Sequence, residues 1–252
     1  MAITVKSSRE IELMREAGKR LEYVHNKLGE LVKPGISTWE IDKAGEKLIR
    51  EQGCIPNFLN YNGFPASICV SVNEEVVHGI PKKNRILQDG DIVSLDAGLI
   101  YKGYHSDAAR THTVGTVNEQ VLKLMEVTKQ SFFEGIKYAK PGCYLYEISN
   151  AIDDYVSQFG YGIVEDLVGH GIGSKLHEDP QIPNFRQRRK GPKLQAGMTL
   201  AIEPMINLGT YEVEWLDDDW TVVAADGLPS AHYENTVLIT DGEPEILTLN
   251  RW

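Results

Sequence analysis

The feature that most constrains the fold is a sequence repeat at an offset of 107 residues. Residues 87–98 (LQDGDIVSLDAG) and 194–204 (LQAGMTLAIEP) both begin Leu-Gln-x-Gly, continue through mostly apolar residues and reach an acid (194 − 87 = 107). Residues 32–41 (VKPGISTWEI) and 139–148 (AKPGCYLYEI) share Lys-Pro-Gly and then aromatic-Glu-Ile at the same offset (139 − 32 = 107). Two matches at one offset predict a fold made of two similar halves, and chance similarity of short segments is the alternative.

Each half is predicted to begin with two helices. Apolar residues recur near helical spacing, and Ser8 with Glu12 nearby indicates the first helix start. A Lys-Pro-Gly turn ends this helix, and Ser37-Thr38 caps the next one. The same order returns in the second half. The predicted helices cover residues 7–32, 37–49, 119–139 and 145–159.

Strand patterns follow each pair of helices. The predicted strands cover residues 67–72, 91–100, 109–115, 162–169, 198–206, 221–225 and 234–240. Short turns between them favour antiparallel pairing with the helices on one face, so we predict an α+β fold with a pseudo-two-fold axis. We expect residues 1–252 to form a single domain, because no linker separates the repeats, which run roughly over 10–115 and 119–240.

Composition excludes several classes of protein. The chain is 42% hydrophobic and 25% charged, which is typical of soluble globular proteins. Its net charge of −10 argues against nucleic-acid and anionic membrane partners. We find no signal peptide, and no apolar run approaches the ~20 residues that span a bilayer. The three cysteines form neither a disulfide framework nor a zinc motif, so we expect a cytoplasmic protein.

The acid of the first half is predicted to lie close to a second acid. Asp96 precedes a turn around Tyr101-Lys102-Gly103, and the chain returns through Asp107. Opposed positions of a two-residue hairpin have an odd sum and share a face, and 96 + 107 = 203 is odd. A Tyr101-Lys102 loop makes the aspartates face each other, whereas a Lys102-Gly103 loop places them one rung apart. Either register leaves them roughly 5–8 Å apart, and a metal ion between them would remove the repulsion.

The second half supplies further candidate ligands. Glu203 is the repeat mate of Asp96, Glu234 opens a predicted strand, and His170 lies in the turn VGHGIG. Four carboxylates carry a charge that two divalent cations cancel, and an oxygen-rich set with one imidazole favours Mn, Fe or Co, with Zn as another candidate. Taken singly, an aspartate after a strand usually faces solvent, and His170 can be read as a loop histidine.

Seven motifs together resemble the type I methionine aminopeptidases. They are VVHGIP (76–81), DAG (96–98), YHSD (104–107), GHGIG (169–173), LHEDP (176–180), AIEPM (201–205) and HYENT (232–236). The resemblance implies the pita-bread fold, with two pseudo-symmetric α+β halves around a central curved antiparallel sheet. It also implies a metal-dependent aminopeptidase that removes the initiator methionine from nascent proteins and peptides when the second residue is small.

The resemblance also implies roles for individual residues. The site would hold two divalent ions (Co, Mn, Fe or Zn). Asp96 would chelate one ion, and Asp107 and Glu234 would bridge both. His170 and Glu203 would complete the ligand shell of the other ion. Glu203 would carry a proton from the attacking water to the leaving amine.

Two histidines and an aromatic pocket complete the implied site. His78 would contact the scissile amide nitrogen, and His177 would donate to the carbonyl oxygen. From the residues alone, a plain turn residue is the favoured reading of His78, and ordinary core packing is the favoured reading of each pocket residue taken singly. Phe58 and Leu176 depart from the residues most common in the family. The implied methionine pocket consists of Tyr61, Phe64, Cys69 and Trp220.

Partners and rival functions follow from the same resemblance. The implied partner is the N-terminal methionine of nascent polypeptides. We expect the protein itself to be a monomer. The basic run FRQRRKGPK at 185–193 suits contact with the ribosome, and a solvated loop is the alternative. Proline-specific aminopeptidases and dipeptidases share the fold, but they usually carry Arg at the position of His232 and a large domain before the position of His78. A non-catalytic binding relative is the remaining alternative.

Overall fold

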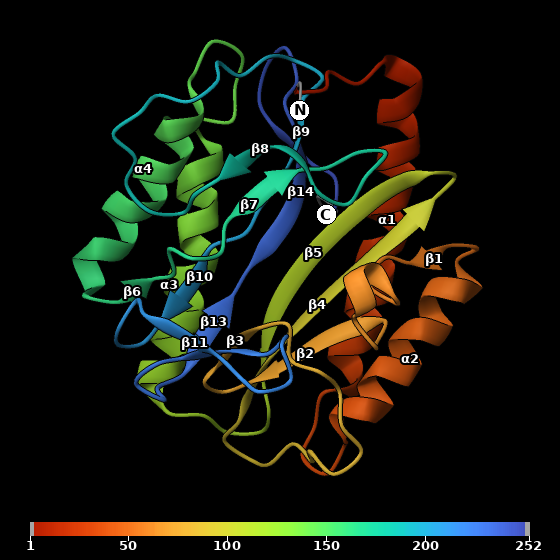
Figure 1. Ribbon diagram of the computed structural model, residues 1–252, viewed down its shortest axis with the longest axis vertical. Coiled ribbons are helices and arrows are strands. Elements are labelled where there is room, and N and C mark those ends of the chain that lie inside the picture. The colour runs from red at the N-terminus through yellow and green to blue at the C-terminus, as the bar shows by residue number, and fades with distance from the viewer. Residues whose placement is uncertain (1–2, 250–252) are drawn as a thin grey trace.

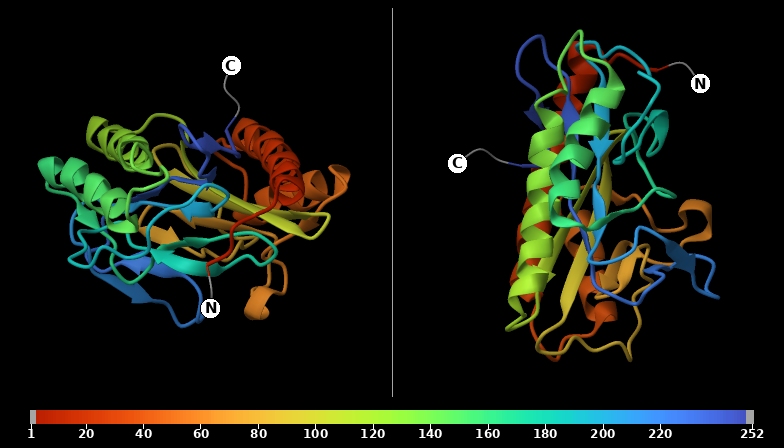
Figure 2. Two further views of the ribbon diagram at one scale, coloured as in Figure 1. Left: turned by 90° about the horizontal axis from the view of Figure 1, so that it is seen from above. Right: turned by 90° about the vertical axis from the view of Figure 1, so that its left-hand side faces the viewer.

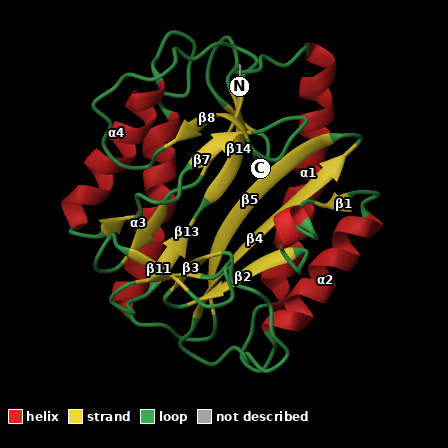
Figure 3. Cartoon of the chain, viewed as in Figure 1, coloured by secondary structure: helices red, strands yellow, loops and turns green. Residues whose placement is uncertain are grey.

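The computed structural model, which describes residues 3–249, places a central antiparallel sheet against four α-helices that lie on one side of it (Figures 1 and 2). Helix α1 packs against α2, and α3 packs against α4, so two helix pairs flank the sheet in Figure 3. The predicted α+β class is therefore confirmed. The helices are α1 (Ser8–Leu31), α2 (Thr38–Glu51), α3 (Glu119–Ile136) and α4 (Leu145–Val156).

The helix ends follow local capping chemistry. The backbone N–H of Ser7 donates to the Glu10 carboxylate at 2.7 Å, which satisfies a donor that the first turn of α1 leaves free. Helix α1 begins at Ser8, as the sequence indicated, but the acid that caps it is Glu10 rather than Glu12, because only the third helical position reaches back to the cap. The helix predicted over 145–159 ends as α4 at Val156 and continues as the 3₁₀ turn η2 (Ser157–Phe159).

The 107-residue repeat recurs in the backbone pairing. Ser37 forms an isolated β-bridge with Ile86, and Tyr144 forms the equivalent bridge with Lys193 (144 − 37 = 107 and 193 − 86 = 107). Each bridge ties the start of the second helix of a pair, α2 or α4, to the loop that leads into a central strand. The two halves therefore use the same connection between their helical and strand layers.

The halves meet inside one sheet. Its strand order is β1-β4-β5-β14-β9-β7-β8, with β2 also paired to β4 and β15 to β14. First-half strand β5 pairs directly with second-half strand β14. The strands are β1 (Ile55–Pro56), β2 (Ile68–Val72), β4 (Ile92–Tyr101), β5 (Tyr104–Thr113), β7 (Gly169–Gly171), β8 (Glu178–Ile182), β9 (Thr199–Ile202), β14 (Glu234–Leu238) and β15 (Glu245–Ile246).

Two small sheets lie beside the central one. One has the order β13-β10-β6 and the other β11-β12-β3. Their strands are β3 (Glu75–Val77), β6 (Gly162–Ile163), β10 (Met205–Asn207), β11 (Val213–Trp215), β12 (Val222–Ala224) and β13 (Ser230–His232), and the short turn η1 (Tyr61–Gly63) precedes β2.

Three predicted strands have different bounds in the structure. Strand β5 begins at Tyr104 rather than at residue 109, because the β4–β5 hairpin pairs along its whole length. The strand predicted over 198–206 breaks at Pro204 into β9 and β10, since proline has no N–H to donate to a ladder. The strand predicted over 162–169 likewise divides into β6 and β7.

Separate hydrophobic cores anchor the two halves. Leu28 of α1 and Leu95 of β4 belong to a core between α1, α2 and the first-half strands, and Phe132 of α3 and Leu200 of β9 belong to its counterpart. Each fully buried side chain of this kind contributes about 2–3 kcal/mol. Strand residues that alternate with these anchors point to the opposite face of the sheet, where the candidate site lies. Within residues 3–249, every helix is too short or too polar to qualify as a membrane-crossing segment.

Candidate metal centre

The β4–β5 hairpin sets the spacing of the first two candidate ligands. Its two-residue loop is Lys102-Gly103, with φ of +48° and +86°, as a type I′ turn requires. The register places Asp96 opposite Ala109, two positions along the strand from Asp107. Of the two registers that the sequence allowed, the one-rung displacement is therefore observed, and both aspartates face the same side of the sheet.

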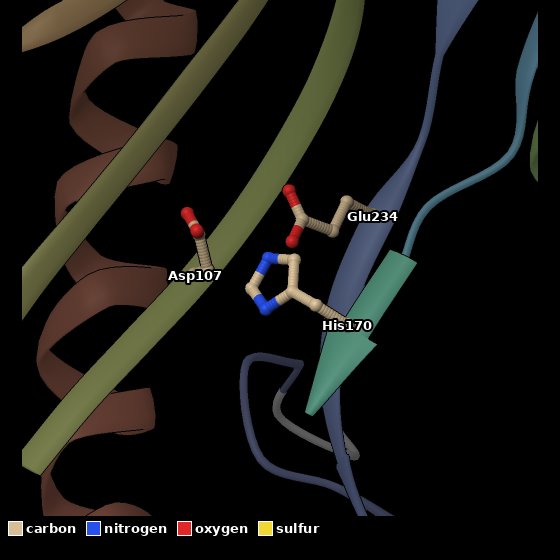
Figure 4. A group of neighbouring side chains, drawn as sticks. All are labelled: Asp107, His170 and Glu234. Carbon is tan, nitrogen blue, oxygen red and sulfur yellow. The ribbon is translucent and has the colours of Figure 1, made fainter. Parts of the chain in front are cut away.

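Three further strands converge on this hairpin. Glu234 begins β14 beside β5, and His170 lies in β7, which reaches the same place through its pairing with β9. Figure 4 shows the side chains of Asp107, His170 and Glu234 pointing toward one another. One potential ligand atom from each of the three lies within 4.8 Å of the others, and all three residues are buried. This spacing suits a shared cation.

Asp96 and Glu203 complete the group. Glu203 follows β9, and its Oε1 lies 3.6 Å from Nε2 of His170. All five candidate ligands named from the sequence line a single cavity of ≈ 180 Å³. The strands of both halves therefore bring together residues that are up to 138 positions apart in the chain (234 − 96 = 138).

The electrostatics of the cavity call for a cation. Burial raises the pKa of Asp96 to about 7. Burial, aided by the neighbouring carboxylates, raises the pKa values of Asp107, Glu203 and Glu234 well above the usual range. One oxygen each of Asp96, Asp107 and Glu234 is buried without a hydrogen-bond partner among the described residues. A divalent ion would neutralise buried carboxylates that repel one another and would coordinate their unpaired oxygens. This set of donor atoms therefore fits a divalent ion.

His170 is held in the state that a metal ligand needs. Its Nδ1 lies 2.9 Å from the carbonyl oxygen of Gly171, and since a carbonyl only accepts, Nδ1 carries the proton. Burial lowers the pKa of His170 to about 3, which keeps the ring neutral. Nε2 therefore presents a lone pair toward Glu203. A carbonyl that fixes the tautomer of a ligating histidine is a recurrent feature of metal sites.

The other predicted site residues line the same cavity. His78 has a φ of +59°, a left-handed conformation that is costly for a residue with a side chain and recurs at functional sites. The Tyr61 hydroxyl lies 2.7 Å from Nδ1 of His177. The cavity is also lined by Phe64, Cys69 and Trp220 of the implied methionine pocket, and by Phe58 and Leu176.

One neighbour of the site was not assigned a role from the sequence. His232 is 1% exposed, and its Nε2 lies 3.7 Å from Oε2 of Glu203, on the other carboxylate oxygen from His170. Both ring nitrogens lack hydrogen-bond partners among the described residues. The available signal was the motif HYENT, in which His232 stands two residues before the candidate ligand Glu234.

Comparison with known proteins identifies the family. Residues 12–241 match the sequence model described as metallopeptidase family M24. Over 247 residues the chain is 53% identical to a methionine aminopeptidase of Clostridium acetobutylicum, covering 98% of this chain and 99% of that one. Over 246 residues it is 51% identical to methionine aminopeptidase 1 of Bacillus subtilis, with 98% and 99% covered. The chain belongs to the methionine aminopeptidases of metallopeptidase family M24.

A solved structure supports the same assignment. The crystal structure of methionine aminopeptidase from Thermotoga maritima superposes with a TM-score of 0.97 at 41% identity, covering 99% of this chain and 100% of that one. The pita-bread fold implied by the sequence motifs is therefore confirmed. Membership of family M24 makes the chain a metallopeptidase, and the cluster of Asp107, His170 and Glu234 is a place where a divalent ion fits.

The basic run at 185–193 lies away from this cavity. Most of its charged residues are exposed on a loop beside α4, where Arg186 forms ion pairs with Asp153, at 3.7 Å, and with Asp154. None of the run contributes to the lining of the metal cavity.

Proposed function

We propose that the protein is a cytoplasmic, monomeric aminopeptidase that removes the N-terminal methionine from nascent polypeptides and peptides whose second residue is small. The observation that carries this proposal is that five candidate metal ligands line one small cavity together with aromatic residues. Identity above 50% to two methionine aminopeptidases over nearly the whole chain supports the same activity. We propose that residues 1–252 act as one catalytic domain.

The five ligands suit two divalent ions, with Mn, Fe, Co and Zn as candidates. Asp96 would chelate one ion, Asp107 and Glu234 would bridge the pair, and His170 with Glu203 would hold the second. When bound, such ions lower the pKa of water and polarise a substrate carbonyl. The buried oxygens of these acids that accept no hydrogen bond are in keeping with this assignment.

Glu203 is suited to move the proton. Its carboxylate lies between two neutral imidazoles, with Oε1 3.6 Å from His170 and Oε2 3.7 Å from His232. Burial lowers the pKa values of both histidines to about 3 and raises the pKa of Glu203 well above the usual range. A carboxyl group with a raised pKa can take a proton from the attacking water and hand it to the leaving amine.

His177 is suited to stabilise the oxyanion. Burial raises the pKa of Tyr61 and lowers that of His177, so the phenol keeps its proton and the imidazole is neutral. If the Tyr61 hydroxyl donates to Nδ1 across their 2.7 Å contact, Nε2 of His177 carries the other proton and can donate to the carbonyl oxygen. His78, held in its left-handed conformation, would contact the scissile nitrogen from the opposite wall.

The cavity wall accounts for selection of methionine. Trp220 packs edge-to-face on Phe64, with ring centroids 5.1 Å apart, and the Cys69 thiol stays protonated because burial raises its pKa. An unbranched thioether chain fits such a narrow apolar slot and makes favourable contacts with its aromatic edges. Phe58 and Leu176 are part of the same buried cluster, so their departures from the common family residues act on the shape of this slot.

Peptide hydrolysis tests the proposal directly. Chelator-treated protein is assayed with Met-Ala-Ser and with Ala-Pro-Ala, before and after addition of Mn²⁺ or Co²⁺, and the released amino acid is identified. Metal-dependent release of methionine from the first peptide alone is expected. Cleavage of only Ala-Pro-Ala would move the protein to the proline-specific branch, and cleavage of neither by metal-loaded protein would leave a binding protein on this fold.

A ribosome contact through residues 185–193 is a further proposal. The run carries five Lys or Arg residues, and the exposed loop beside α4 leaves most of them accessible. Cosedimentation with ribosomes should weaken when these charges are removed, and unchanged cosedimentation would favour a simple solvated loop.

A further inference from the structure

A shallow groove adjoins the catalytic cavity and has no part in the mechanism above. It encloses ≈ 560 Å³ and is lined by Lys82, Trp215, Leu216, Asp217 and Asp218. Trp215 is 52% exposed and Leu216 41% exposed, which is unusual for large apolar side chains placed next to each other. Exposed apolar residues that lie together beside an active site are candidates for contact with a ligand.

Both walls of the groove continue into the catalytic cavity. One wall ends at Lys82, four residues after the cavity residue His78, and the other ends at Asp218, two residues before the cavity residue Trp220. The rings of His78 and Trp220 are 6.3 Å apart, and Lys82 pairs with Asp218 at 3.8 Å. Pairing of β3 with β12 holds the two segments side by side. A polypeptide leaving the cavity between these walls would enter the groove.

The hairpin that forms one wall is strongly acidic. Residues 211–232 contain six Asp or Glu and no Lys or Arg. Asp218 is occupied within the hairpin, since it accepts from the backbone N–H groups of Trp220 and Thr221 at 3.1 and 2.8 Å. Asp217, which lines the groove, is exposed and forms no ion pair with any residue between 3 and 249. The groove therefore offers apolar contact and uncompensated negative charge.

We propose that this groove binds the substrate polypeptide beyond its second residue and favours basic and apolar side chains there. The inference rests on the proposed function, because it needs the N-terminal methionine to be held in the cavity. The chain beyond an anchored N-terminus advances about 3.3 Å per residue when extended, so only substrates longer than a tripeptide reach well into the groove. Basic side chains would meet Asp217, and apolar ones would pack on Trp215 and Leu216.

Peptide length and charge provide the test. Metal-loaded enzyme is assayed with Met-Ala-Ser and with two longer peptides, Met-Ala-Ser-Lys-Leu-Lys and Met-Ala-Ser-Glu-Leu-Glu. The variants are Trp215→Ala, Asp217→Lys and the control Leu228→Ala, which removes an apolar side chain of similar exposure (43%) outside the groove. Thermal unfolding of each variant checks that the fold is retained.

We expect the wild type to cleave the basic peptide with a KM about fivefold below that of the acidic peptide, equivalent to about 1 kcal/mol. Trp215→Ala should reduce kcat/KM for the basic peptide relative to the tripeptide by about fivefold, mainly through KM, because the contact is made equally in the ground and transition states. Asp217→Lys should reverse the preference for the basic over the acidic peptide. Leu228→Ala should leave unchanged both the KM ratio of the acidic to the basic peptide and the kcat/KM ratio of the basic peptide to the tripeptide.

Two outcomes would overturn the inference in different ways. Equal KM values for the three peptides in the wild type, or a fall in tripeptide and long-peptide cleavage together in Trp215→Ala, would refute the groove and leave the proposed function standing. Failure of the metal-loaded wild type to cleave Met-Ala-Ser would refute the proposed function, and the groove with it.

Discussion

The metal-free protein should lose stability as the pH rises from 4 to 7, because its buried carboxyl groups hold protons. Burial raises the pKa of Asp96 from the ordinary value of 3.8 to about 7. The folded state thus binds this proton more tightly than the unfolded chain does. The stabilisation is fully present below pH 3.8 and is lost as the pH rises through about 7.

The expected size follows from the same pKa difference. At about 1.4 kcal/mol for each tenfold change in a protonation equilibrium, Asp96 alone contributes about 4 kcal/mol to the free energy of unfolding at low pH. Replacement by asparagine removes this titration. It also removes the repulsion from Asp96, which after burial is the next cause of the raised pKa of Asp107. The change at Asp107 therefore alters the pH dependence of stability in the same direction.

The assay is urea unfolding of chelator-treated protein between pH 4.5 and 7.5. The free energy of unfolding of the wild type minus that of Asp96→Asn should fall steadily across this range. Asp241→Asn, which changes the same chemical group on an exposed turn, is the matched control, and its difference from the wild type should stay flat. Added Mn²⁺ should abolish the loss in the wild type, because a bound cation replaces the protons.

A flat difference for Asp96→Asn would refute the reasoning, since it would mean that the carboxyl group is ionised at pH 5 in the folded, metal-free protein. A rising difference would mean that an unrecognised cation stabilises the charged form. Glu10→Gln gives a contrast of opposite sign when the series is extended below pH 4.5: hydrogen bonds from Ser7 lower the pKa of Glu10 to about 2, so its stabilisation is present above pH 4.5 and lost on further acidification.

Three further predictions concern the catalytic cavity. Glu203→Gln should lower kcat on Met-Ala-Ser by roughly 10²–10⁴ with unchanged circular dichroism, and full activity in metal-loaded protein would remove Glu203 from the mechanism. His177→Ala should lower kcat by about 10²–10³ with a smaller change in KM, measured at saturating metal, and a pure KM effect would assign it to binding only. Gly98→Ala should destabilise the fold by about 1–3 kcal/mol and weaken Mn²⁺ binding in calorimetry, because the added Cβ would lie 2.5 Å from Nδ2 of Asn57 and 3.0 Å from Oδ1 of Asp107. Wild-type stability and metal affinity in Gly98→Ala would show that these side chains move aside freely.

The β4–β5 hairpin shows which features follow from local sequence and which require the tertiary structure. The sequence predicted that Asp96 and Asp107 share a face, because parity along a strand is a local property. It left two registers open, and the structure decides between them through the Lys102-Gly103 turn, whose left-handed backbone matches the twist of the two strands.

The cavity residues show the same division. The motifs of the sequence named the five candidate ligands that line the cavity. They gave no role to His232 beside Glu203 and did not show the left-handed backbone of His78. Both depend on the packing of segments from different halves, which no local pattern encodes. Likewise, the sequence predicted one strand over residues 198–206, and only the sheet topology shows that β9 and β10 lie in different sheets on either side of Pro204.

The sequence by itself determined the 107-residue repeat, the order of the four helices, and the acids that end the apolar runs, because these follow from periodicity and from turn and cap chemistry within short segments. The tertiary structure alone decided that Asp107, His170 and Glu234 meet within 4.8 Å. Four strands must pair in one order, β5 with β14 and β9 between β14 and β7, before those side chains can converge. That order is set by burying two separate cores against one sheet, which is a property of the whole chain.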